Sequence, residues 1–428
     1  MTTAKPLDLP PGTTTEAQHK ATFFRQSGWM MMATVGSGVM MMLVHVYSKY
    51  IPEDEYSAVG TLIQLLNWMM IPAIGLQTVF AQQTSAAVTP AQQRQLAGTF
   101  HAVLRLTFVI WLVMLGVALG FQGALLKAMK IHNPAALWVT LVVGWMMLWQ
   151  PIFQGLLQGR QNFLWLGWVA VFNAFGRVVI AGIIVVVFHG WAAGIMTGAL
   201  IGLVALVASA GWQNRDLFTA PRERFAAREW LGRVVPLTLG CGASQFLFSA
   251  DMFVVQDHFD NTGPYVLGMT LARAIVLFTA PLVAVMFPKI VRSLAHGQKS
   301  NLLLLTCLGT GALAVGAAVA LPLVSPLLIK AISTQANLAI LPLIPLFAWA
   351  MVPLAMANVL LNNLMARSRF TGVPAMVLVA VFYWLGLQRF HGSFDMVART
   401  MGGFNLLFLL VCVVFTWEPW ARRTPARA

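Results

Sequence analysis

Charged residues are scarce in this chain of 428 residues. Asp, Glu, Lys and Arg make up 9% of it, hydrophobic residues make up 59%, and the mean hydropathy is +0.76. A soluble globular domain carries about 25% charged residues, so this composition excludes an ordinary soluble domain. Apolar runs long enough to cross roughly 30 Å of hydrocarbon recur along almost the whole chain. The sequence therefore predicts an all-α polytopic membrane protein.

Cysteine is also rare, and signatures of enzyme and metal sites are missing. Cys241, Cys307 and Cys412 lie far apart within apolar runs, which favours small buried residues over a disulfide framework. We find no Walker A motif, no HExxH motif and no His or Cys pair at metal-ligand spacing. These absences indicate a protein that is not an enzyme and uses no cofactor or metal.

Twelve apolar segments are long enough to span a bilayer as helices. We place them at 28–47, 58–80, 99–121, 135–157, 164–188, 192–212, 234–255, 265–288, 302–323, 338–361, 371–388 and 400–417. The net charge of +14 does not indicate nucleic-acid binding, because the basic residues are spread over short loops. Seventeen Lys and Arg residues fall on one side of the membrane and six on the other. The positive-inside rule then places both termini in the cytoplasm.

An internal repeat divides the chain into halves with six predicted spans each. A shift of about 209 residues places Tyr56 on Tyr265 and Pro72 on Pro281, and a shift of about 208 places Gln150 on Asn358 and Gln154 on Asn362. The loop 160–163 likewise parallels 367–370. We therefore predict a tail (1–27), a lobe (28–212), a basic linker (213–233), a second lobe (234–417) and a tail (418–428). Pro72 and Pro281 are candidate hinges, because proline bends helices.

Asp251 and Arg273 are charged residues inside predicted spans. They lie on consecutive spans at similar depths, so we expect them to meet across the hairpin. A charge in hydrocarbon costs a few kcal/mol or more and normally faces the bundle interior or a wet cavity. The pair is either a structural tie between two helices or part of a transport path.

Amide side chains form a stripe on one predicted helix in each half. Gln150, Gln154 and Gln158 follow one another at one-turn intervals in the first half, and Asn358 and Asn362 are one turn apart in the second. Such amides either bond neighbouring helices or line a hydrophilic cavity, where they suit sugar hydroxyls.

Arg177 stands near the middle of its predicted span, with Asn173 one turn before it. Its central depth makes snorkelling to the interface difficult. A buried arginine without an acidic partner is suited to a phosphate, which its planar fork binds bidentately. The alternative is an arginine that hydrogen-bonds backbone carbonyls of a kinked neighbour.

Several segments resemble the Wzx-type polysaccharide-export flippases of the multidrug/oligosaccharidyl-lipid/polysaccharide exporter superfamily. The segments that carry the resemblance are the turn 50–60 (YIPEDEYSAVG), the stretch 155–163 (GLLQGRQNF), and Phe248–Asp251 followed by Tyr265, Arg273 and Phe287–Lys289. The resemblance implies two six-helix lobes around a central cavity that opens alternately to either side of a bacterial inner membrane. It also implies that Arg177 and Arg273 bind the diphosphate of a polyprenyl-linked oligosaccharide, with membrane lipids and polysaccharide-biosynthesis enzymes as further partners.

Two other function classes make different demands on the sequence. A cation-coupled multidrug exporter of the same superfamily is expected to carry a carboxylate in its first lobe. We place none within a span of that lobe, because the acidic cluster Glu53–Glu55 is expected to be a solvated part of an outer loop. A membrane polymerase or ligase acting on lipid-linked glycans needs a large outer loop with catalytic residues, whereas the predicted loops are short.

Overall fold

The chain is almost entirely helical in the computed structural model. The structure describes residues 16–43, 50–52, 55, 58–59, 62–63, 65–66, 69, 73, 75–128, 133–259, 262–296, 302–332 and 340–417. Its helices are α1 Glu16–Leu43, α3 Leu76–Ala86, α4 Pro90–Gly120, α5 Gln122–Ala128, α6 Pro134–Gly159, α7 Phe163–Phe175, the π-helix η3 Gly176–Ile180, α8 Ala181–Phe188, α9 Trp191–Gln213, α10 Asp216–Thr219, α11 Ala227–Ser249, α12 Asp251–His258, α13 Gly263–Ala295, α14 Leu302–Ile332, α15 Ile344–Ala366, α16 Val373–Arg389 and α17 Phe394–Trp417.

Nine helical segments of the described chain are long and apolar enough to cross a membrane, which confirms a polytopic membrane protein. Val373–Arg389 is a shorter apolar helix at another of the twelve predicted spans. Residues 28–43 of the first predicted span lie in α1, which is not among the nine, and residues 44–47 lie outside the described residues. Part of the second, 58–80, including Pro72, lies outside the described residues.

Some helices are longer than their apolar runs predict. The helix α4 begins at Pro90, nine residues before the predicted 99, because Thr89 caps it and Gln92 completes a capping box. The helix α14 continues to Ile332 through Pro322 and Pro326. The predicted linker 213–233 contains the short helix α10, a stretch without regular secondary structure at 221–226 and the first turns of α11.

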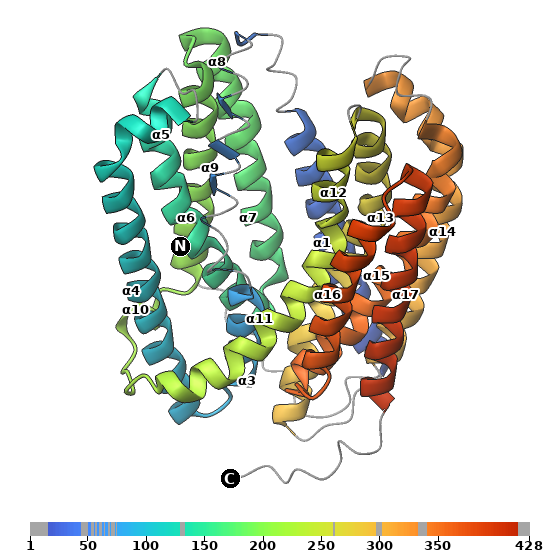
Figure 1. Cartoon of the computed structure of the whole chain (residues 1–428). Helices are drawn as coiled ribbons and strands as arrows, with labels where there is room; N and C mark the ends of the chain where they lie inside the picture. Colours follow the sequence, from blue (N-terminus) through green and yellow to red (C-terminus); the bar gives the residue numbers. More distant parts are fainter. Residues whose placement is uncertain are drawn as a thin grey trace.

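Two bundles stand side by side in Figure 1. One contains α4, α6, α7, α8 and α9, and the other contains α13 to α17 (Figure 1). Three helices connect them: α1 packs on α7 and α13, α3 packs on α6 and α13, and α11 packs on α3, α15 and α16. The bundles meet at the lower end in Figure 1 and diverge towards the upper end.

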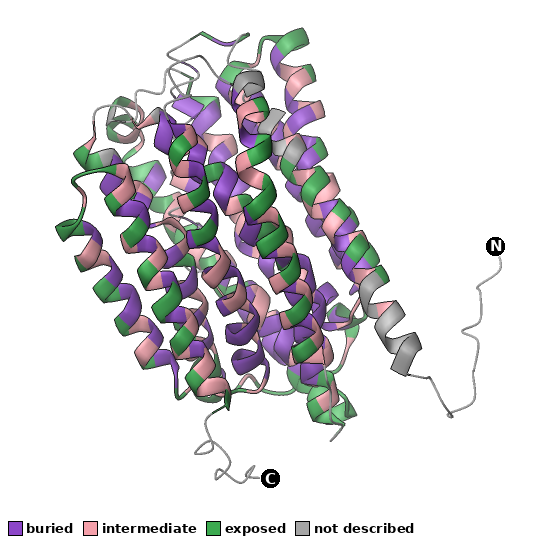
Figure 2. Cartoon of the chain, turned by 90° about the vertical axis from the view of Figure 1, so that its right-hand side faces the viewer, coloured by how far each residue is buried: buried purple, intermediate pink, exposed green. Residues whose placement is uncertain are grey.

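The outer faces of the bundles are apolar and exposed. On α14, Leu304 and Leu308 are each 64% exposed, and Leu323 and Leu327 are 78% and 71% exposed. Each of these pairs is one helical turn apart, so the residues of a pair lie on one face. Figure 2 shows exposed positions along the outward sides of the helices, with buried positions between them. In a membrane protein such a surface contacts lipid.

Candidate functional site

The carboxylate of Asp251 is the centre of a buried polar cluster in the second bundle. Asp251 is fully buried at the start of α12, and two side chains of α13 donate hydrogen bonds to it. Arg273 Nη2 lies 2.6 Å from Oδ1, and the Tyr265 hydroxyl lies 2.7 Å from Oδ2. The predicted pairing of Asp251 with Arg273 is therefore confirmed. Tyr265, which the sequence analysis aligned with Tyr56 but did not connect to Asp251, is the second donor.

Part of this cluster retains hydrogen-bonding capacity. Arg273 Nε and the hydroxyl of Tyr383 are buried without a hydrogen-bond partner in the described part of the chain. The guanidinium also lies over the Phe248 ring, 5.4 Å from its centroid. The cluster ties α12 to α13, and it leaves Arg273 Nε as a buried donor without an acceptor among the described residues.

Arg177 lies in the first bundle, within the π-helical turn η3. Its Nε donates a hydrogen bond of 3.3 Å to Asn173 Oδ1, one turn earlier on α7. Across the described ranges, no carboxylate forms an ion pair with Arg177. Asn173, one turn before Arg177, is thus in contact with it, and no carboxylate of the described residues neutralises the positive charge. Single π turns occur often at functional sites.

Close helix packing holds the segment that carries Arg177. A Cβ atom built on Gly176 would lie 2.3 Å from the Cα of Gly202, and one on Gly198 would lie 2.5 Å from Ala181 N. Only glycine permits such an approach of α9 to η3 and to the start of α8. The backbone beside Arg177 is therefore fixed against a neighbouring helix of the same bundle.

The predicted amide stripes are placed in two different ways. Gln150 Nε2 lies 3.4 Å from Gln154 Oε1 on α6, and both residues are half-buried. On α15, Asn358 Oδ1 accepts a hydrogen bond of 2.6 Å from Ser244 of α11, and Asn362 Nδ2 donates to the Asn358 carbonyl. Asn358 therefore bonds a neighbouring helix, and Gln150 and Gln154 bond only each other among the described side chains.

Two other glutamines connect the bundles. Gln158 Nε2 of α6 donates to the Ala284 carbonyl of α13 at 3.0 Å. This carbonyl lacks its usual helical donor, because the residue four positions later is Pro288. Gln82 of α3 donates to the Met365 carbonyl at 2.8 Å and to Ser368 Oγ at 3.0 Å, where α15 ends. The bond of Gln158 to another helix agrees with one of the two readings of the amide stripe. Sequence reasoning identified neither its partner nor the contacts of Gln82, although Pro288 marks a free carbonyl.

The two loops that the repeat aligns have the same backbone geometry. Gln161 and Ser368 have positive φ values of 58° and 53° at the ends of α6 and α15. In both loops the residue with positive φ donates its N–H to the carbonyl three residues back, and the next residue donates to the carbonyl five residues back. This is the Schellman arrangement, here with non-glycine residues at the left-handed position. The shared geometry supports an internal duplication.

The remaining predicted residues have mixed outcomes. Pro281 is buried inside α13, and Pro72 lies outside the described residues. The reading of Glu55 as a solvated loop residue is wrong: it is 6% exposed, and its carboxylate accepts a hydrogen bond of 3.4 Å from Ala192 N at the start of α9. A carboxylate at a helix N-terminus is stabilised by the helix dipole, which the acidic cluster alone did not indicate.

The chain has the fold of solved MATE structures. A MATE structure in the bent conformation matches with a TM-score of 0.76 and 11% identity over 93% of this chain and 94% of that one. A MATE structure in the straight conformation matches with a TM-score of 0.72 and 12% identity, over 93% and 95%. The Vibrio cholerae MATE transporter VcmN matches with a TM-score of 0.72 and 15% identity, over 94% and 97%. No family model and no curated protein sequence matches the chain. The likeness confirms the expected MATE-like fold of a polytopic helical membrane protein.

Proposed function

We propose that this protein moves a polyprenyl-diphosphate-linked oligosaccharide across a bacterial inner membrane by alternating access. The observation that carries the proposal is Arg177, a guanidinium in a membrane-spanning segment whose side chain bonds Asn173 and forms no ion pair with a described carboxylate. A charge without a counter-ion at this depth costs free energy, and ionisable residues within membrane spans commonly mark a substrate or ion path.

The chemistry of the substrate matches these side chains. A diphosphate needs cationic donors, and the planar fork of arginine binds phosphate oxygens bidentately. Arg177 in the first bundle and Arg273 in the second are the cationic donors of this proposal. The Nε of Arg273 is buried and unpaired among the described residues, so a diphosphate reaches it only after the surrounding helices move. Gln150 and Gln154 supply amides that suit sugar hydroxyls, while the prenyl chain stays in lipid.

The contacts between the bundles suit alternating access. The hydrogen bonds of Gln158 and Gln82 join the bundles at the end where α3, α6, α13 and α15 meet. A hydrogen bond contributes roughly 0.5–1.5 kcal/mol net, so a few of them close this end by only a few kcal/mol. A free-energy difference of this size between the closed and the open conformation allows both to be populated, and a ligand can shift the balance between them.

Variants of Arg177 test the proposal. We expect Arg177→Gln to insert and fold normally yet to abolish export, so that lipid-linked glycan accumulates in the inner leaflet. Arg177→Lys keeps the charge and loses the fork, and we expect it to retain part of the activity. The matched control is Arg105→Gln, because Arg105 is exposed on α4 of the same bundle. Full export by a well-expressed Arg177→Gln variant contradicts the proposed role.

One observation favours a second candidate, a cation-coupled exporter of small molecules. Glu55 is a buried carboxylate beside the first bundle, where such an exporter needs an acidic residue. In this reading Glu55→Gln abolishes export of cationic dyes and leaves glycan export untouched. Dye export that depends on Glu55, without glycan movement, selects this second function.

A further inference from the structure

The amide of Gln245 is a polar group deep within a membrane-spanning segment. The segment runs from Ala227 to Val255, and Gln245 lies about 15 Å from Val255 at 1.5 Å per residue. That distance is about half the thickness of a hydrocarbon core. Gln245 is nevertheless exposed, whereas the amides of the two predicted stripes are buried or half-buried. The Gln245 side chain forms no hydrogen bond with the described residues.

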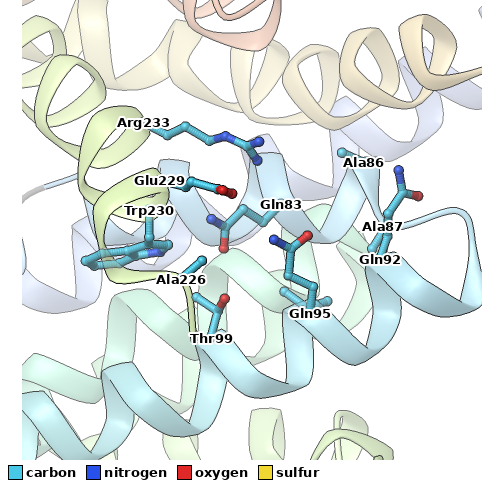
Figure 3. A pocket seen from close by; sticks show the side chains of 11 residues that line it. Gln83, Ala86, Ala87, Gln92, Gln95, Thr99, Ala226, Glu229, Trp230 and Arg233 are labelled. Atoms are coloured by element: carbon cyan, nitrogen blue, oxygen red, sulfur yellow. The ribbon is translucent and has the colours of Figure 1, made fainter. Parts of the chain in front are cut away.

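Exposed polar groups are ordinary at the start of α11 but not at the depth of Gln245. At the start, Glu229, Trp230 and Arg233 line a polar pocket of about 160 Å³ with residues of α3 and α4, as Figure 3 shows. Polar side chains at such a helix end reach water or lipid headgroups. Gln245 lies about 24 Å beyond Glu229 along the helix. An amide that faces hydrocarbon leaves its donors and its acceptor unsatisfied, so the exposure of Gln245 indicates a space beside it that holds water or a polar ligand.

The neighbours of Gln245 along α11 show in which direction its side chain projects. Four residues earlier, Cys241 Sγ lies 3.9 Å from Thr78 Oγ1 of α3. Three residues later, the Phe248 ring lies under the Arg273 guanidinium, 5.4 Å away. Residues three and four positions apart share one face of a helix. Gln245 therefore projects towards α3, which packs on α6 of the first bundle, and towards Arg273 of the second.

The lipid-facing side of α11 is a different one. Val235 and Leu239 are apolar and each 48% exposed. At 3.6 residues per turn, these two residues project about 80° and 120° away from Gln245 around the helix, both in the same direction. Gln245 thus lies at the edge of the exposed side of α11 that is nearer to the other bundle, and the space beside it lies between the bundles.

We propose that Gln245 lines the transport path and hydrogen-bonds the transported glycan. A glutamine amide both donates and accepts, as a sugar hydroxyl does, so it bonds hydroxyls of different orientation. Because Phe248, one turn later, packs on Arg273, a glycan held by Gln245 lies close to the guanidinium proposed for the diphosphate. The identity of the ligand as a glycan rests on the proposed function, whereas the position of Gln245 in a polar path does not.

Labelling of single cysteines tests the position of Gln245 without requiring transport. Gln245→Cys in a cysteine-free background is purified in nanodiscs and treated with MTSET, a charged methanethiosulfonate, and mass spectrometry follows the modification. Glu229→Cys is the water-exposed reference, and Val315→Cys, at an exposed apolar position of α14, is the lipid-facing control. We expect Gln245→Cys to react at least about tenfold faster than Val315→Cys, because the reactive thiolate forms in water. If Gln245→Cys does not fold, Ser249→Cys, one turn later, replaces it. Equally slow reaction at both positions overturns the proposal.

Flipping of the lipid-linked glycan tests the contact itself. Gln245→Leu keeps the size and removes the hydrogen-bonding groups, so flipping at limiting substrate should slow roughly 3–10-fold, the worth of one hydrogen bond. Gln245→Glu should slow it further, because a carboxylate repels a diphosphate. The control Gln388→Leu alters an exposed amide near the end of α16 and should flip normally. Normal flipping by a folded Gln245→Leu overturns the proposal. Fast labelling at position 245 in a wild-type protein that exports cationic dye and flips no glycan refutes the proposed function and keeps Gln245 in the path.

Discussion

Removal of the Tyr265 hydroxyl is expected to destabilise the protein through the charge of Asp251. The hydroxyl donates a hydrogen bond of 2.7 Å to a fully buried carboxylate, and Tyr265 is itself fully buried. A hydrogen bond to a charged group is worth about 1.5–3 kcal/mol. Hydrogen bonds between membrane helices average about 0.6 kcal/mol with a maximum near 1.7, because the unfolded chain in the membrane also finds partners. We therefore expect Tyr265→Phe to lower the free energy of unfolding by about 1.5 kcal/mol.

Tyr383→Phe is the matched control for this prediction. Tyr383 is also fully buried, but its hydroxyl has no hydrogen-bond partner within the described structure. Removal of an unsatisfied buried hydroxyl is nearly neutral or stabilising. Unfolding titrations with SDS in mixed micelles give the free energy of unfolding of each variant. Equal losses in the two variants, or a larger loss in Tyr383→Phe, refute the reasoning.

Three further predictions concern charges and contacts elsewhere. Asp251→Asn leaves the buried Arg273 guanidinium without its carboxylate and should lower the free energy of unfolding by about 3–5 kcal/mol, as unfolding titrations measure. The double change Asp251→Arg with Arg273→Asp restores the pair, so it should express better than either of its single changes. Gln158→Leu leaves the Ala284 carbonyl unpaired, so the two bundles should separate at the end where they meet. Spin labels at positions 93 and 371 in a cysteine-free background should then report a longer distance, with Gln154→Leu as the control. An unchanged distance in Gln158→Leu contradicts this prediction. The Arg160 guanidinium, 2.8 and 2.5 Å from the Asp216 oxygens, lowers the pKa of that carboxyl. The stabilisation from this ion pair is present above the pKa of Asp216 in the unfolded chain, about 3.9, and is lost as the pH falls through the lower pKa of Asp216 in the folded protein. Because the Asp216 side chain is 61% exposed, the stability lost at low pH is at most about 1 kcal/mol. Melting curves across pH 2–5 should show this loss in the wild-type protein and not in Asp216→Asn.

Contacts along one helix or across one hairpin were predictable from sequence spacing. Asn173 and Arg177 are one turn apart, and Asp251 and Arg273 have similar depths on consecutive spans, so helical geometry alone brings each pair together. The loops at Gln161 and Ser368, which the sequence repeat aligns, share their backbone geometry, as expected if the two segments are repeats.

Contacts between bundles were not predictable in the same way. The partner of Gln158 is a backbone carbonyl of another helix, so its identity depends on how the two bundles pack. Glu55 follows Glu53 and Asp54 in the sequence, and a run of three acidic residues suggests a solvated loop. Its burial depends on the position of α9, whose first turn donates a hydrogen bond to its carboxylate. The pocket at Trp230 arises because Gly98 lets the stretch before α11 lie against α4.

Flipping in a purified system tests the central claim most directly. The protein is reconstituted into liposomes that contain a polyprenyl-diphosphate-linked oligosaccharide in one leaflet, and a membrane-impermeant lectin measures the glycan that reaches the other leaflet. We predict that the wild-type protein and Arg105→Gln accelerate this movement, and that Arg177→Gln does not. No acceleration by the wild-type protein, in vesicles where it exports a cationic dye, contradicts the account.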